Sequence, residues 1–398
     1  MIGRLLTLTF LLLAAAPSSA QVPEAPGPHA VGWKDVSFSH PLSGNSTVQA
    51  RLYYPAQSAG QGAVADATAG PFPLVGFLHG YFAFVDYYDD VCTQLASHGF
   101  FVTSVATESG FFMSVPNEAK DSRAMLHWTE DQAKPGGTFE GMVEIGGDWS
   151  TIGHSNGGAA SFYLASAEPR VQRLVLFEPN WLNPPGVSTF AGPVMVVGGS
   201  QDIVAPASIN AARYFTELTS SPRCFYVVLQ GAGHNASLDF PIDLSTMPHA
   251  VGKSLHQRLA AGFLRAEVKG ETQHFRHMLG TIAQEQSLLP ISRASSPVHW
   301  SGSSSLTFHF GIAGRVDDSI AGLAVGPLGA NLPTTYGLLG VDMASAFSQI
   351  VPMPNNGIMD SALPYSPALV GLSVFSQGLR LAADGTGVLT APNVHTLL

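Results

Sequence analysis

The sequence has few charged residues, only two cysteines and, after its first twenty residues, no apolar run long enough to span a bilayer. Charged residues make up 12% of the 398 residues, against roughly 25% in an average soluble protein. A net charge of −10 argues against a basic nucleic-acid-binding face. Cys92 and Cys224 are too few for a disulfide scaffold or a cysteine-based zinc site. A hydrophobic content of 45% argues against a disordered chain.

The first twenty residues have the pattern of a secretory signal peptide. Arg4 supplies a positive charge, residues 5–16 are apolar, and small residues lead to Ala20. The apolar run is shorter than the roughly 20 residues of a membrane span, so we expect cleavage near Ala20 and export to the periplasm or the medium. Export would permit a disulfide between Cys92 and Cys224, but the sequence does not show whether these residues meet.

The pattern after the leader predicts an α/β domain over residues 21–285. Alternating segments at 33–40 and 47–54 flank a turn and predict a β-hairpin. Short apolar runs then alternate with amphipathic segments, which predicts a mostly parallel sheet with helices on both faces. The expected strands are 74–78, 100–105, 149–153, 171–177, 194–197 and 225–229, and the expected helices are 87–98, 159–167, 207–218 and 249–267, the last of which could continue to 279.

The composition changes near residue 295. Residues 295–398 contain two Arg, five Asp and no Lys or Glu, so only 7 of 104 residues are charged. Alternating runs at 306–312 and 369–375 predict a separate small β-rich module. It carries no recognisable catalytic cluster. Substrate binding, attachment to a surface, stability and secretion all remain open as its role.

The strongest chemical signal is the motif Gly153-His154-Ser155-Asn156-Gly157. It follows the expected strand at 149–153 and precedes the expected helix at 159–167. A strand-to-helix turn this tight tolerates almost no side chain two residues before or after the serine, and it presents the serine hydroxyl at the carboxyl end of the sheet. The pattern therefore predicts Ser155 as a nucleophile.

A serine nucleophile needs a base, and the base needs an orienting carboxylate. Asp202 and His234 each follow an expected strand, at the same edge of the sheet as Ser155. Glu178, at the end of the strand after the nucleophile helix, is the alternative acid. The other histidines lack such placement. We expect His274 and His277, one helical turn apart, on a solvated face.

Two backbone N–H groups are candidates to stabilise the oxyanion that forms during acyl transfer. One belongs to Asn156, next to the nucleophile at the helix start, and the other to Tyr81, after a strand that ends in His79-Gly80. The Tyr81 side chain is also a candidate wall of the acyl pocket, with loop packing as the alternative. No metal and no organic cofactor are implied by the sequence.

The motifs in this region resemble those of the α/β-hydrolase superfamily, over residues 30–280. Within it, the chain is similar to secreted cutinase-like, polyester-hydrolase and dienelactone-hydrolase-like serine esterases. The resemblance implies a Ser155–Asp202–His234 triad, a Tyr81/Asn156 oxyanion pair and Trp181 as an aromatic beside the substrate cleft. Asn156 stands where polyester hydrolases usually carry methionine. The segments that carry the resemblance are VGFLHGY (75–81), LASHGFFV (95–102), IGHSNGG (152–158), PVMVVGGSQDIVAP (193–206) and LQGAGH (229–234).

The expected function is that of an exported serine carboxylesterase that acts through an acyl-enzyme. Ser155 precedes Asp202 by 47 residues and Asp202 precedes His234 by 32, which leaves no room for a large helical lid. An unlidded cleft suits small or polymeric esters. A lipase and a dienelactone-type lactone hydrolase are the alternatives, although the family's lactone hydrolases often use cysteine. A non-catalytic surface-binding protein on a hydrolase fold is the alternative of another class. The oligomeric state is not indicated.

Overall fold

The computed structural model describes residues 22–221, 223–242, 245–277, 288–290, 298–301, 307–313, 318–352, 358–364, 372–385, 387–389 and 393–396. The predicted signal peptide at residues 1–20 lies outside the described residues. Residues 278–287 and 291–297 lie outside them too, so the predicted boundary between two domains is not tested. None of the helices in the described ranges combines the length and the apolarity that a membrane crossing needs.

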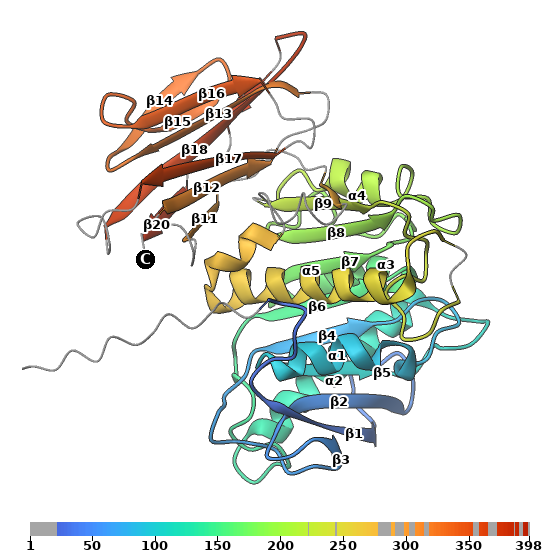
Figure 1. Ribbon diagram of the computed structural model, residues 1–398. Coiled ribbons are helices and arrows are strands. Elements are labelled where there is room, and N and C mark those ends of the chain that lie inside the picture. Colours follow the sequence, from blue (N-terminus) through green and yellow to red (C-terminus); the bar gives the residue numbers. More distant parts are fainter. Residues whose placement is uncertain are drawn as a thin grey trace, which may run out of the picture.

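A ten-stranded sheet forms the centre of the N-terminal part, in the order β10-β9-β8-β7-β6-β4-β5-β2-β1-β3 (Figure 1). The six strands from β5 to β9 in this order pair in parallel, and the pairs β1–β2, β2–β5 and β9–β10 are antiparallel. The predicted hairpin and the predicted parallel sheet are confirmed. The strands are β1 (Ala30–Phe38), β2 (Val48–Ala56), β3 (Gly60–Gln61), β4 (Leu74–Leu78), β5 (Phe101–Val105), β6 (Trp149–His154), β7 (Val171–Phe177), β8 (Val194–Gly199), β9 (Cys224–Leu229) and β10 (Leu288–Pro290).

Helices cover both faces of this sheet. They are η1 (Val85–Tyr88), α1 (Asp89–Ser97), α2 (Val115–Ala133), α3 (Asn156–Ala167), α4 (Ala211–Glu217), α5 (His249–Lys269) and η2 (Thr272–His277). α1 and α5 share one hydrophobic cluster, while α2, α3 and α4 share the other. Within β4, Val75 and Phe77 join the first cluster, and Leu74 and Leu78 join the second. Both faces of the strand are therefore buried, which explains its uninterrupted apolar sequence.

Helix α2 is absent from the sequence-based prediction, although it has 19 residues. Its buried positions include Glu118, Asp121 and Glu130, so the apolar periodicity that marks an amphipathic helix is diluted. The start carries a recognisable signal, because the Ser114 hydroxyl accepts a hydrogen bond from the Asn117 N–H and a proline stands in the first turn. The helix lies between β5 and β6 and covers the sheet beside the candidate nucleophile.

The placement of His274 and His277 on a solvated face is wrong, since both side chains are buried. α5 ends at Gly270, whose φ of 69° is the left-handed conformation that stops helices. The chain then turns back as η2 and brings Phe275 within 6.0 Å, between ring centroids, of Phe225 in β9. The two histidines are therefore buried with η2 and do not continue a solvent-facing helix.

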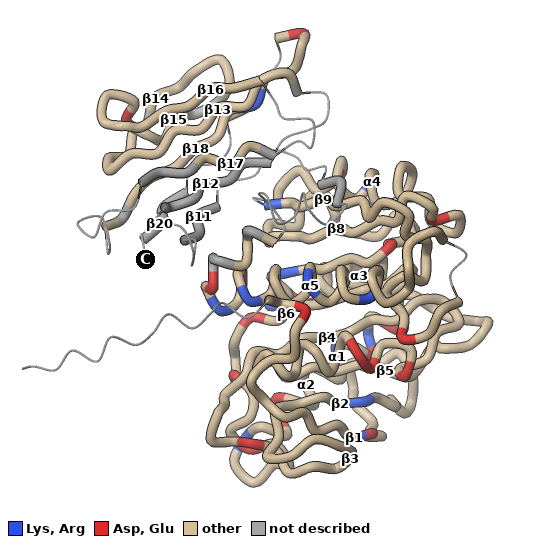
Figure 2. Tube along the Cα trace, in the orientation of Figure 1, with Lys and Arg blue, Asp and Glu red and all other residues tan. Residues whose placement is uncertain are grey.

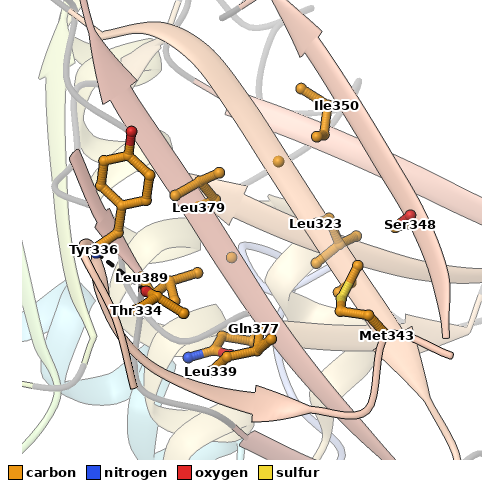
Figure 3. Close-up of a pocket in the computed structure, with 13 residues that line it drawn as sticks. Leu323, Thr334, Tyr336, Leu339, Met343, Ser348, Ile350, Gln377, Leu379 and Leu389 are labelled. Carbon is orange, nitrogen blue, oxygen red and sulfur yellow. Dashed lines mark hydrogen bonds between the residues drawn. The ribbon is translucent and has the colours of Figure 1, made fainter. Parts of the chain in front are cut away.

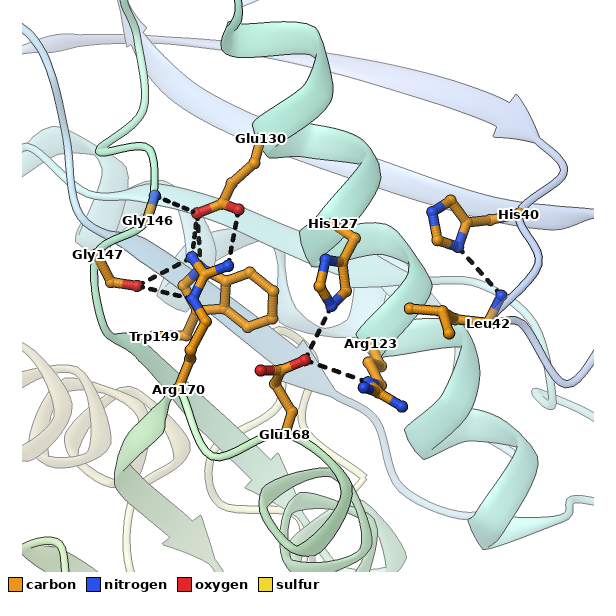
Figure 4. A network of polar contacts seen from close by, with 10 residues as sticks. All are labelled: His40, Leu42, Arg123, His127, Glu130, Gly146, Gly147, Trp149, Glu168 and Arg170. Atoms are coloured by element: carbon orange, nitrogen blue, oxygen red, sulfur yellow. Dashed lines mark hydrogen bonds and ion pairs between the residues drawn. The ribbon is translucent and has the colours of Figure 1, made fainter.

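A polar network fastens α2 to the amino ends of β6 and β7, at the edge of the sheet opposite the candidate site (Figure 4). The Glu130 carboxylate pairs with the Arg170 guanidinium and also accepts hydrogen bonds from the Trp149 indole and the Gly146 N–H. Glu168 accepts hydrogen bonds from Arg123 and His127, which keep its pKa below the usual range although burial alone would raise it. Both carboxylates are buried and paired, so the network stabilises this end of the domain.

The described residues after 298 form small antiparallel sheets, as the sequence predicts. The sheets are β11-β12-β17, the five-stranded β16-β13-β18-β19 with β20 paired to β18, and the pair β14-β15. Where these sheets are not drawn in grey, Figure 2 shows few charged residues along them. The predicted strand at 306–312 corresponds to β12, while part of the predicted strand at 369–375 lies outside the described residues. The strands are β11 (Val298–Ser301), β12 (Thr307–Ala313), β13 (Asp318–Gly326), β14 (Gly329–Thr334), β15 (Gly337–Val341), β16 (Phe347–Pro352), β17 (Ile358–Pro364), β18 (Ser373–Ala382), β19 (Gly387–Leu389) and β20 (Asn393–Thr396).

Candidate active site

The turn between β6 and α3 holds Ser155 in a strained backbone conformation, with φ 54° and ψ −117°. A Cβ added at Gly153 would lie 2.2 Å from the Gly157 carbonyl oxygen, and one added at Gly157 would lie 2.1 Å from the Leu78 carbonyl oxygen. No side chain fits in either place. Gly153 is therefore required by the turn itself, and Gly157 is required by the close packing of the turn against the end of β4.

The loops after β8 and β9 bring Asp202 and His234 to this turn. The His234 Nε2 lies 2.9 Å from the Ser155 Oγ, and its Nδ1 lies 2.8 Å from the Asp202 Oδ2. The other oxygen of Asp202 accepts hydrogen bonds from the N–H groups of Val204 and Ala205, both at 2.8 Å. Because the carboxylate accepts from Nδ1–H, Nε2 is left to accept the serine proton.

Glu178, the alternative acid, faces another partner. Its Oε1 lies 2.9 Å from the His256 Nε2 of α5, and both side chains are buried. The His256 Nδ1 contacts the Gly252 carbonyl oxygen at 2.7 Å, which orients the ring within its own helix. Burial raises the pKa of Glu178, and the charge of His256 opposes that rise. The structure thus brings Asp202, and not Glu178, into contact with His234.

A buried chain of hydrogen bonds that the sequence analysis did not find runs behind the site. The Gly80 N–H donates to the Tyr88 hydroxyl at 3.1 Å, which donates to the His154 Nδ1 at 2.8 Å. The His154 Nε2 lies 2.9 Å from the His234 carbonyl oxygen, so Nε2 carries the proton. Burial lowers the pKa of His154 well below its usual range, in keeping with a neutral ring. No local sequence signal marks Tyr88 for this role.

Of the two candidate oxyanion donors, Asn156 follows Ser155 directly in the chain and Tyr81 lines the same cavity as Ser155. The backbone N–H groups of Tyr81 and Asn156 make no hydrogen bond to another described group, so both are available to a ligand. The Asn156 side chain is held in place, since its Oδ1 accepts from Asn180 at 2.9 Å and its Nδ2 lies 3.8 Å from the Met113 sulfur.

A cavity of about 250 Å³ opens at Ser155. Tyr81 lines it, and so do Phe82, Leu238 and Ile242, which the sequence analysis did not single out. Trp181 is not among the lining residues; its ring packs edge-on against Tyr214 and under the Arg213 guanidinium, 4.5 Å away. The cleft contact predicted for Trp181 therefore stays a prediction.

Exposed aromatic side chains lie at this cavity or pack on its lining residues. The rings of Phe82 and Phe111 lie 4.4 Å apart between centroids, with 42% and 69% of these residues exposed. The Tyr81 hydroxyl donates to the Phe111 carbonyl oxygen at 3.1 Å and ties the two loops together. Phe82 has a φ of 54°, a strained value for a residue with a side chain. The Tyr81 and Phe111 loops thus present joined aromatic side chains beside the cavity.

The two cysteines are free thiols, buried in α1 and β9 respectively. Among the described residues, no group of three or more His, Cys, Asp or Glu side chains has an arrangement that could hold a metal ion.

Comparisons with known proteins find one matching family model and several similar relatives. Residues 13–246 match the model of the family described as PET hydrolase-like. The chain is 26% identical over 222 residues to Cutinase 1 of Thermobifida cellulosilytica, a match that covers 55% of this chain and 77% of the relative. A cutinase of Thermobifida fusca is 26% identical over 222 residues, covering 55% and 67%. A bis(hydroxyethyl) terephthalate hydrolase of Streptomyces coelicolor is 27% identical over 225 residues, covering 55% and 64%.

Proposed function

The chain belongs to the PET hydrolase-like family and is a carboxylic ester hydrolase, and from this premise we propose that it is an exported serine esterase acting on uncharged polyester chains or their small soluble esters. The observation that carries the proposal is the contact series Ser155–His234–Asp202, at 2.9 and 2.8 Å, on the strained turn after β6. The matched segment, the parallel sheet and this turn support an α/β-hydrolase fold.

In the proposed reaction the Ser155 hydroxyl attacks the ester carbonyl carbon while its proton passes to the His234 Nε2. The oxyanion accepts hydrogen bonds from the N–H groups of Tyr81 and Asn156. The carbonyl re-forms, the alcohol leaves with the proton from Nε2, and the acyl group remains on the serine. Water then attacks the acyl carbon, giving its proton to Nε2, and the acid is released as the proton returns to the serine. Asp202 keeps Nδ1–H oriented and balances the charge of the imidazolium.

The surface around the cavity supports an uncharged, apolar substrate. Phe82 lines the cavity and packs on the exposed Phe111 ring, and Ile203 and Val204 follow Asp202 with 83% and 66% of their surface exposed. Between β6 and residue 221 the only helices are α3 and α4, so no helical lid is inserted there. A polymer chain could therefore reach Ser155 without a conformational change. Apolar surface exposed to this degree suits contact with an apolar ester.

A fluorophosphonate probe tests the nucleophile. We expect labelling of the full chain that disappears in Ser155→Ala and persists in Ser166→Ala, an exposed serine of α3. A folded protein that is not labelled would favour the non-catalytic surface-binding alternative. A chain-length series of p-nitrophenyl esters, run beside a polyester film, then defines the substrate. A preference for emulsified long-chain triglyceride over short soluble esters would contradict the open cleft.

Export is tested by N-terminal sequencing of protein collected outside the cytoplasm of the producing cell. We expect the mature chain to begin near Gln21, after the small residues that end the apolar run. A chain that retains its first twenty residues in the membrane fraction would contradict cleavage.

A further inference from the structure

The C-terminal part of the chain contains a second cavity, separate in sequence from every residue of the Ser155 site (Figure 3). Its volume is about 240 Å³, and the thirteen residues that line it come from the five-stranded sheet, from the β14–β15 hairpin and from the turn before β16. For comparison, an apolar cavity of roughly 150 Å³ in another protein stays dry and binds benzene. The space is therefore large enough for a short ligand.

Small residues in strand β13 form the floor of this cavity. Strand register places Ile350, Gly322, Leu379 and Leu389 in one row across β16, β13, β18 and β19. A Cβ at Gly322 would lie 3.2 Å from the Leu379 Cβ and 3.6 Å from the Ile350 Cγ1, so these side chains rise on either side of it. Two residues further along β13 stands Ala324, another small side chain. The floor is thus a trough between aliphatic side chains.

The β14–β15 hairpin is tied to this sheet at two points. The Gln377 side-chain oxygen of β18 accepts a hydrogen bond from the Gly340 N–H at 2.8 Å. The Leu389 N–H of β19 donates to the Tyr336 carbonyl oxygen at 2.8 Å. These bonds hold the hairpin against the sheet. The sheet therefore forms one wall of the cavity and the hairpin forms the other.

The lining favours an uncharged occupant. None of the thirteen residues is Lys, Arg, His, Asp or Glu. A fatty-acid carboxylate in the cavity would lose its hydration without gaining a positive partner, which is unfavourable. At the same time, Ile350 is 68% exposed and Met343 is 45% exposed, so apolar lining continues to the surface.

We propose that this cavity binds a short segment of an uncharged aliphatic ester chain and thereby holds polymeric substrate on the enzyme. The choice of an ester rests on the function proposed above; the preference for a neutral aliphatic chain rests on the cavity alone. The binding is reversible and involves no covalent step.

The test uses the full chain with Ser155→Ala, labelled with ¹³C at methionine methyl groups, and dibutyl adipate as the neutral diester probe. We expect the Met343 methyl signal, assigned with Met343→Leu, to shift in a saturable way with the diester and not with hexanoate anion. Ile350→Asp places a charge at the exposed mouth, and we expect it to weaken this binding at least tenfold. Leu328→Asp is the matched control, since Leu328 is 56% exposed and does not line the cavity.

The outcomes separate this site from the catalytic one. In the chain that keeps Ser155, Ile350→Asp should hydrolyse p-nitrophenyl butyrate at the unaltered rate but release less product from a polyester film. An unshifted Met343 signal, equal binding of hexanoate, or diester binding that is as tight in Ile350→Asp as in Leu328→Asp would overturn the proposal. If the chain that keeps Ser155 hydrolyses no ester but the Ser155→Ala chain still binds the diester, the proposed function is contradicted and the proposal for this cavity is not.

Discussion

The ring of His154, the residue before the candidate nucleophile, is hydrogen-bonded through Nε2 to the carbonyl oxygen of His234, the candidate base, at 2.9 Å. The Nδ1 of the same ring accepts a hydrogen bond from the Tyr88 hydroxyl. That hydroxyl accepts a hydrogen bond from the N–H of Gly80, the residue before Tyr81. One buried imidazole thus links the turn that bears the nucleophile, the loop that bears the base and the loop that bears an oxyanion donor. The three loops are positioned relative to one another by two side chains.

Tyr88→Phe tests this link. The change removes one hydroxyl and leaves the Gly80 N–H and the His154 Nδ1 without partners in a buried region. Unsatisfied buried groups of this kind cost about 1–3 kcal/mol, so we expect a fall of that size in the free energy of unfolding. We also expect kcat for p-nitrophenyl butyrate to fall about tenfold with little change in KM, because the affected groups act on transition-state geometry.

The matched control is Tyr226→Phe. The Tyr226 hydroxyl donates to the Ala207 carbonyl oxygen at 3.1 Å, outside the Tyr88–His154 chain, and the side chain is buried. We expect this variant to lose stability but to keep its kcat. Equal kinetic effects in the two tyrosine variants would show that Tyr88 acts through general stability and not through positioning.

Asp202→Asn and Glu178→Gln distinguish the two candidate acids. An amide at Asp202 no longer fixes the His234 tautomer, and comparable changes lower kcat by about 10⁴-fold. Glu178 contacts His256, so Glu178→Gln should keep kcat within about tenfold while lowering thermal stability. Steady-state measurement of kcat for both variants, on a soluble ester at pH 8, shows which carboxylate supports His234. A larger loss in Glu178→Gln than in Asp202→Asn would reverse the assignment.

Asp239, on the loop after His234, should make stability fall as the pH rises. Burial raises the pKa of its carboxyl to about 7, although it accepts a hydrogen bond from the Asp90 N–H. In the unfolded chain this carboxyl has a pKa near 3.9. Between about pH 4 and pH 7 the folded state therefore binds more protons than the unfolded state, and stability declines as the pH rises through that window. We therefore expect Asp239→Asn to have a Tm close to that of the parent at pH 4 and above it at pH 8.

Thermal unfolding of Asp239→Asn across this pH range, with exposed Asp86→Asn as control, measures the effect. The control should follow the parent at every pH. A Tm for Asp239→Asn that stays parallel to the parent from pH 4 to pH 8 would show that the carboxyl does not titrate in this window.

Arg170→Met tests the network at the opposite edge of the sheet. The change leaves the buried Glu130 carboxylate without its charged partner, and the loss of one partner of a buried pair costs about 3–5 kcal/mol when both are fully buried. Since Arg170 is partly exposed, we expect a loss of about 2–3 kcal/mol in the free energy of unfolding by urea and an unaltered kcat. Lys134→Met, which breaks the exposed pair with Asp131, should have no measurable effect.

Local pattern predicted the strands and the nucleophile turn because each leaves its signal within a short stretch of the sequence. Gly153 is needed by the turn itself, Gly157 is needed where the turn packs against β4, and the apolar runs that became β4, β7 and β9 are buried on both faces. Where polar residues are buried, the same reasoning failed. α2 escaped prediction because partners elsewhere in the fold satisfy Asp121 and Glu130, so a helix with polar residues on its buried side remains stable.

The sequence by itself determined the chemistry available at one edge of the sheet: a serine on a glycine-bounded turn, followed by an aspartate and a histidine after later strands. Only the tertiary structure decided which carboxylate meets His234, that His256 takes Glu178, and that Tyr88 reaches His154. Those choices join residues 32 to 78 positions apart in the chain, and they depend on the direction in which each side chain leaves its loop. Spacing in the sequence carries no record of that direction, because packing across the sheet sets it.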